Sequence, residues 1–210
     1  MALECRSTQR RFSRAAGHGF SLIELLIVTA LIVFMFTLYF GGGSRGFQKQ
    51  QMARCDGNLQ KLQVTLKTYA LDNQDKFPAL SDVATSEPVL SLLVPRSTST
   101  TDFFICPGSK DKPIEDGQPF ARGRISYAYY MGCNGQDGAD TPLASDRQVN
   151  TNSKRRGQPL FSQDGKAPGN NHSKYGGNVL FCDGSVKNSA PFAAFDLTNG
   201  SNVVLLNPKP

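Results

Sequence analysis

The sequence predicts an α+β protein in which a long N-terminal helix, first transmembrane and then amphipathic, packs on a small antiparallel β-sheet with a loop-rich C-terminal region. Three observations predict this class. An apolar run extends from Phe20 to Phe40 with a single charged residue. An apolar stripe at helical spacing lies within residues 48–75. All twelve prolines follow residue 77, so helix-breaking residues and short β-type runs are confined to the back of the chain.

Length and charge limit the organisation. The 210 residues suffice for one modest domain plus an anchor. Half of the formal net charge of +6 lies in a basic leader, residues 1–19, which holds four arginines and one glutamate. The remainder shows no basic stripe interleaved with aromatic residues, so nucleic acid is not expected as a partner.

The apolar run, residues 20–40, is a candidate transmembrane helix. At about 1.5 Å per residue, a helix of this length spans roughly 30 Å, the thickness of the hydrocarbon layer. The preceding arginines predict a cytoplasmic N-terminus and a periplasmic or otherwise extracytoplasmic domain, residues 76–210. The chain is therefore expected in the inner (cytoplasmic) membrane as a single-pass protein. An ordinary signal peptide, cleaved after the run, is the alternative.

Two segments connect the apolar run to the domain. Residues 41–47 are rich in glycine, which weakens helices, and they predict either a hinge or a flexible linker. Residues 48–75 carry the stripe and predict an amphipathic helix that packs on the sheet. Pro78 ends this helix. The stripe comprises Met52, Cys55, Leu59, Leu62, Leu66 and Tyr69, and the opposite side carries Gln60, Lys61, Gln63 and Lys67.

Short runs rich in β-branched and aromatic residues predict strands, separated by turn-forming clusters. They are residues 102–106, 125–131, 159–162, 178–182, 185–188 and 202–206. Asp183 and Gly184, between two of these runs, predict a two-residue type I′ hairpin.

Glu24 is the one acid in the apolar run. A carboxylate inside hydrocarbon costs about 2.5–3.5 kcal/mol and usually has a partner. Near the start of a helix the cost is reduced, because the helix dipole and the headgroups favour a negative charge there. Either the acid is tolerated near the interface, or it pairs with a free α-amine that cleavage between Gly19 and Phe20 would create.

The stretch "GFSLIELLIV", residues 19–28, resembles the processing motif of type IV prepilins and of type II secretion pseudopilins. The resemblance implies that a prepilin peptidase, a membrane aspartyl enzyme, cuts after Gly19. It also implies that Phe20 becomes the N-methylated new N-terminus and that Glu24 pairs with a neighbouring subunit's N-terminus during assembly. His18 stands where this motif often has lysine or arginine.

Further segments are similar to a prepilin-like subgroup: residues 53–78, "FFICPGSKD", "ISYAYYMGCNG" and "HSKYGGNVLFCDGSV". The last resembles a C-terminal signature in which nine residues separate a histidine from Asp-Gly. Here ten residues separate His172 from Asp183, and Gly184 follows. The resemblance implies a pilin-like fold, with the inner membrane and other pilin or pseudopilin subunits as partners.

Two further groups are candidate chemical sites. A catalytic pair of His172 with Asp183 would also need a nucleophile or metal in a recognisable setting, and a structural role for the histidine is preferred. Asn134, Asp137 and Asp140 offer oxygen ligands for calcium without the EF-hand spacing, and a solvated turn is preferred. No catalytic residue and no cofactor are therefore expected.

Four cysteines follow the leader, an even number that fits an oxidising compartment. Three connectivities, or free buried thiols, are compatible with the sequence. The shortest loop favours a Cys106–Cys133 disulfide, which leaves Cys55–Cys182 as the second.

The sequence thus predicts a pilin-like structural subunit, with no enzymatic activity, of a type II secretion or type IV pilus machine. The alternative is a membrane-anchored binding or adhesion module, or a minor tip pilin, with the same anchor. An anchored periplasmic enzyme built around His172 is the least favoured hypothesis.

Overall fold

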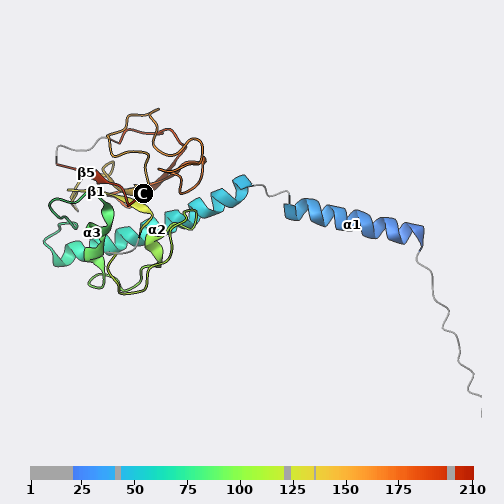
Figure 1. Cartoon of the computed structure of the whole chain (residues 1–210), viewed down its shortest axis with the longest axis horizontal. Helices are drawn as coiled ribbons and strands as arrows, with labels where there is room; N and C mark the ends of the chain where they lie inside the picture. The colour runs from blue at the N-terminus through green and yellow to red at the C-terminus, as the bar shows by residue number, and fades with distance from the viewer. Residues whose placement is uncertain (1–20, 41–43, 121–123, 135, 198–201) are drawn as a thin grey trace, which may run out of the picture. The chain divides into compact units, whose positions relative to one another are not determined.

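The computed structural model describes residues 21–40, 44–120, 124–134, 136–197 and 202–210 (Figure 1), and two compact units divide after Gly42. The leader, including Gly19 and Phe20, lies outside the described residues. In the first unit, helix α1 spans Leu22–Phe40, and its segment Leu22–Tyr39 is long and apolar enough to cross a membrane. No residue of that segment is buried.

Helix α2 (Ser44–Asp72) begins the second unit. The segment expected to be a hinge, residues 41–47, is helical over residues 44–47, where α2 begins. Residues 41–43 lie outside the described residues. The predicted stripe is confirmed, because Cys55, Leu59, Leu62 and Leu66 are completely buried. Gln63, expected on the outer face, is buried instead, because the hairpin glycine Gly184 packs against its side chain.

Short helices follow α2: α3 (Ser86–Leu90) and the 3-10 turns η1 (Ser91–Leu93) and η2 (Asp102–Phe104). The strand predicted over residues 102–106 is therefore wrong. Consecutive strand residues point to opposite faces, whereas Phe103 and Phe104 are both buried in one core with their ring centroids 4.4 Å apart. A helical turn allows both rings to enter that core.

In the described part of the chain, the sheet has five antiparallel strands in the order β4-β3-β2-β1-β5. They are β1 (Tyr127–Met131), β2 (Pro142–Asp146), β3 (Gly177–Phe181), β4 (Val186–Ser189) and β5 (Val204–Leu206). The antiparallel α+β class is confirmed. Residues 159–162 form no regular strand, since the N–H groups of Leu160 and Phe161 both donate to one carbonyl, that of Pro191. Strand β2, which lies at the centre of the sheet, was not predicted.

The β3–β4 hairpin has a different turn from the predicted one. Leu180 pairs with Val186, and Phe181 N–H donates to Ser185 O, so the loop consists of residues 182–184. Gly184 has φ +92°, but Asp183 is not among the residues with positive φ. A type I′ turn needs positive φ at both central residues, so this is a three-residue loop closed by a left-handed glycine.

Two cores cover the two faces of β3. Leu180 belongs to the larger core with the buried stripe of α2, whereas Val179 and Phe181 belong to a smaller core. Because side chains alternate along a strand, the smaller core lies on the face opposite α2. Its other members come from residues 160–197, the loop-rich region that Figure 1 shows in orange and red tones.

Candidate functional site

Glu24 lies in the first turn of α1, where the helix dipole favours an acid. Its side chain is exposed, and within the described residues no ion pair includes it. The processing residues Gly19 and Phe20 lie outside the described part of the chain. The pairing of Glu24 with an α-amine and the cleavage after Gly19 therefore both stay predictions.

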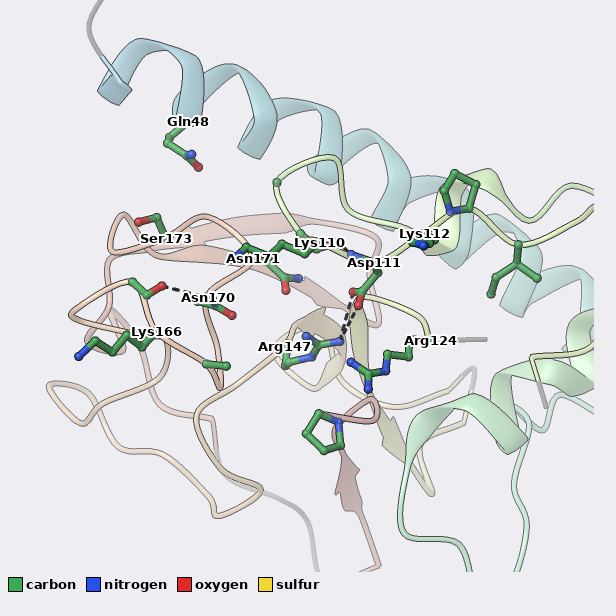
Figure 2. Close-up of a pocket in the computed structure, with 17 residues that line it drawn as sticks. Gln48, Lys110, Asp111, Lys112, Arg124, Arg147, Lys166, Asn170, Asn171 and Ser173 are labelled. Atoms are coloured by element: carbon green, nitrogen blue, oxygen red, sulfur yellow. Dashed lines mark hydrogen bonds and ion pairs between the residues drawn. The ribbon is translucent and has the colours of Figure 1, made fainter. Parts of the chain in front are cut away.

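A groove of about 1040 Å³ opens on the second unit beside the first turns of α2. Its walls are the segments 108–114 and 165–173, and Gln48 of α2 contributes from above (Figure 2). Among the described residues, five cationic side chains line it and define what we call the cationic groove: Lys110, Lys112, Arg124, Arg147 and Lys166.

Asp111 is the acid in the lining of the cationic groove, and it is already neutralised. Arg147 Nη2 lies 3.2 Å from Asp111 Oδ2, and both side chains are nearly buried. Ser126 Oγ donates to the same oxygen at 2.8 Å. Lys166 lies 4.0 Å from Asp164, and both of these are exposed. The groove therefore keeps a positive excess that suits an anionic ligand.

Behind one wall lies a buried polar pair that the sequence did not reveal. His172 Nε2 is 3.2 Å from Asp146 Oδ2, and neither side chain is exposed. Asn171 Nδ2 donates to Asp146 Oδ1 at 2.9 Å, and Asn178 N–H donates to Oδ2 at 2.8 Å. These three contacts of the aspartate all come from the segment 171–178, so Asp146 positions this wall of the groove.

The same pair contacts a disulfide, Cys55–Cys106, which ties α2 to the segment after η2. His172 Nε2 lies 3.4 Å from Cys106 Sγ, and Gly108 N–H donates to that sulfur. The ligand atoms of Cys55, Cys106, Asp146 and His172 lie within 4.8 Å of one another. Cysteine binds Zn²⁺ as a thiolate, and the disulfide leaves no thiolate on Cys55 or Cys106.

The predicted disulfides, Cys106–Cys133 and Cys55–Cys182, are wrong in this structure. Cys55 pairs with Cys106 across a separation of 51 residues, and Cys133 and Cys182 are free and buried. The shortest-loop argument fails because Cys55 points from the buried face of α2 directly toward the segment that follows η2. Loop length does not report which elements pack together.

The structure does not join His172 to Asp183. Asp183 Oδ1 accepts hydrogen bonds from Ser185 N–H at 2.8 Å and from Ser185 Oγ at 2.7 Å, within the hairpin loop. These bonds lower the pKa of Asp183. Burial and the Asp146 carboxylate raise the pKa of Tyr127, near the histidine pair, well above its usual value. A completely buried His172 has no access to a substrate in this conformation.

The calcium candidates have other partners. Asn134 Oδ1 accepts from Gln136 N–H, and Asp137 Oδ2 accepts from Asn134 N–H, both at 2.8 Å. Asp140 Oδ1 lies 3.3 Å from Lys187 Nζ. The oxygens of this turn thus satisfy its own backbone and a nearby cation, as a solvated turn would.

Asp146, Arg147 and Asp111 are the residues that sequence reasoning missed. The available signal was "SDR", residues 145–147, a polar run that the structure buries at the end of β2. No protein-family model, curated protein or solved structure matches the chain.

Proposed function

We propose that this chain is a pilin-like structural subunit, anchored by α1 and assembled with other subunits into a filament based in the inner membrane. The observation that carries the proposal is α1 itself. It presents apolar side chains on all sides and an acid in its first turn. Such a helix needs lipid or other helices around it, and its acid needs a cation.

The proposed sequence of events follows the resemblance. A prepilin peptidase hydrolyses the bond after Gly19, and the new amine of Phe20 is methylated. In the filament, Glu24 of one subunit then faces the α-amine of its own or of a neighbouring subunit. The position of α2 supports this proposal, because α2 packs on the sheet and only residues 41–43 separate it from α1 in the sequence.

The test is Glu24→Ala in the full chain. We expect normal membrane insertion, normal cleavage and loss of filaments, because the helix keeps its length but the amine loses its acid. Glu24→Asp is the matched control and should retain part of the assembly. Mass measurement of the N-terminus monitors cleavage and methylation, and electron microscopy monitors filaments. Normal filaments from Glu24→Ala would contradict the proposal.

Processing has a separate test. Gly19→Leu should leave the full-length chain uncut in the membrane, since a bulky residue replaces the glycine before the cleavage site. Electrophoresis reports the size, and a mature band equal to that of the wild type would exclude the expected peptidase.

The second candidate is a membrane-anchored binding module or minor tip subunit, and the cationic groove favours it. We expect the full chain in detergent to bind dextran sulfate, used as an anionic probe, with an affinity that falls as salt rises. Lys110→Glu with Arg124→Glu should weaken the retention of the protein on immobilised dextran sulfate. The control, Lys61→Glu with Lys67→Glu on the exposed side of α2, makes the same change of charge outside the groove. Equal retention of the two variants would exclude a groove-specific site.

Stoichiometry separates the two candidates. A major structural subunit should occur along the whole filament, whereas a binding subunit at the tip should be scarce. Immunogold labelling along isolated filaments measures this directly.

A further inference from the structure

Two thiols from distant parts of the chain meet beside the start of β2. Cys133 follows β1 and Cys182 follows β3, and β2 lies between these two strands in the sheet. The two Sγ atoms and a carboxylate oxygen of Asp137 lie within 4.8 Å of one another. Both cysteines are free and buried.

Backbone contacts fix both cysteines to the same short segment. Cys133 Sγ donates to Pro142 O at 3.5 Å, and Cys182 N–H donates to Thr141 O at 2.9 Å. Thr141 and Pro142 are consecutive and lead into β2. The proximity of the thiols therefore follows from sheet pairing and does not depend on the conformation of a free loop.

The two thiols are chemically unequal. The neighbouring Cys133 thiol lowers the pKa of Cys182, while Cys182 and burial raise the pKa of Cys133. The thiolate is the nucleophile in disulfide exchange, so in the folded domain Cys182 is the more nucleophilic of the two sulfurs.

We propose that Cys133 and Cys182 are an oxidation site that becomes the second disulfide of the domain, joining the end of β1 to the β3–β4 hairpin across the start of β2. The oxidant is the disulfide of an extracytoplasmic thiol–disulfide oxidoreductase. This supply rests on the proposed extracytoplasmic location.

The exchange is balanced in two steps, and it occurs before the hairpin closes over the sulfurs, so either cysteine can attack first. With Cys182 as the first, its thiolate attacks one sulfur of the oxidant, which forms a mixed disulfide and releases the other sulfur as a thiolate. Cys133, after losing its proton, attacks Cys182 Sγ and expels the second thiolate. The oxidant gains two electrons and leaves as a dithiol with the two protons of the cysteines, and the domain gains one S–S bond.

Binding of a metal ion is the alternative role for Cys133, Cys182 and Asp137. Asp137 with the two thiolates would offer three of the four ligands of a tetrahedral Zn²⁺ site. An oxidising compartment favours the disulfide, because the same domain already carries the oxidised pair Cys55–Cys106. Bound zinc is therefore an outcome that would overturn the proposal.

Trypsin separates all four cysteines of the domain. Cleavage after lysine and arginine places Cys55 in residues 55–61, Cys106 in 97–110, Cys133 in 125–147 and Cys182 in 175–187. The full chain is isolated from membranes without reductant, blocked with N-ethylmaleimide in denaturant, digested and analysed by mass spectrometry. We expect 125–147 linked to 175–187, and the linked mass should disappear after reduction. The pair 55–61 with 97–110 is the internal reference.

Recovery of 125–147 and 175–187 as separate alkylated peptides would overturn the proposal, whatever the state of the reference pair. So would one equivalent of zinc whose removal by a chelator exposes both thiols. In Cys133→Ser, Cys182 should become fully alkylated while the reference pair stays linked. The disulfide mapping uses unassembled protein from the membrane. The result of the mapping is therefore independent of the filament test with Glu24→Ala.

Discussion

Helices α1 and α2 follow one another in the chain, yet they differ in what satisfies their apolar side chains. Large apolar side chains of α1 are 42–86% exposed, whereas Leu59, Leu62 and Leu66 of α2 are completely buried. The buried stripe of α2 is covered by the domain of its own chain. The apolar side chains of α1 have no such cover within the described residues, and α1 is long and apolar enough to cross a membrane.

The same contrast holds for two carboxylates in apolar elements. Asp146 is completely buried but accepts hydrogen bonds from Asn171 and Asn178 and contacts His172. For Glu24, the described residues provide no ion-pair partner. Replacing Asp146 should therefore affect folding, whereas replacing Glu24 should affect assembly.

The largest effect on stability is expected for Asp146→Ala. The Asn178 N–H and the His172 ring would lose their acceptor in a buried site, and each orphaned donor costs about 1–3 kcal/mol. We expect the free energy of unfolding to fall by about 2–6 kcal/mol. Urea unfolding of the detergent-solubilised chain, followed by tyrosine fluorescence, measures it. Asp164→Ala, at an exposed carboxylate, is the control, and equal losses in both variants would refute the role of the buried pair.

Identical substitutions in the two helices test the comparison directly. Leu62→Ala in α2 removes a completely buried side chain and should cost about 2–5 kcal/mol. Leu31→Ala in α1, where the side chain is 55% exposed, should leave the unfolding of the domain unchanged. The same urea experiment compares them. A large loss from Leu31→Ala would mean that α1 contributes to the folded domain.

These two helices also show how far the sequence could predict the structure. Both follow from local patterns, an apolar run and a stripe at helical spacing, because helices are built from near neighbours in sequence. Strand β2 escaped prediction because "PLASD" combines a proline with polar residues that normally lie in turns. Ser145 and Asp146 are buried there only because partners from residues 171–178 and 148 reach them.

The site was harder to predict than the fold, because it depends on contacts between segments that are far apart in the sequence. The His172 partner, Asp146, and the Cys55 partner, Cys106, are fixed by packing between distant segments, which spacing in the sequence does not encode. The cationic groove likewise combines Lys110, Arg124 and Lys166 from three separate loops. Glu24 could be singled out because its position within one helix is itself the signal.

Two glycines in the domain should respond in opposite directions to alanine. Gly184 has φ +92°, and a Cβ there would also meet the side chain of Gln63, so Gly184→Ala should cost about 1–2 kcal/mol. Gly57 lies inside α2, and a methyl group added there would meet no atom within 4 Å, so Gly57→Ala should add about 0.8–1 kcal/mol. Thermal or urea unfolding measures both changes. A gain in stability from Gly184→Ala would contradict the left-handed glycine that closes the three-residue hairpin loop.

The smallest effect is expected for Asp183→Asn, and it depends on pH. The Ser185 hydroxyl and N–H lower the pKa of Asp183 in the folded state. The unfolded value is about 3.9, so the carboxylate stabilises the fold fully above that pH and loses its contribution as pH falls through the lower folded-state pKa. The wild type should exceed the variant by less than about 1 kcal/mol at pH 7, because the carboxylate is exposed and screened by solvent. Urea unfolding from pH 7 to 2 should show this difference vanish at the acidic end. A difference that persists there would assign it to the shape of the hairpin and not to its charge.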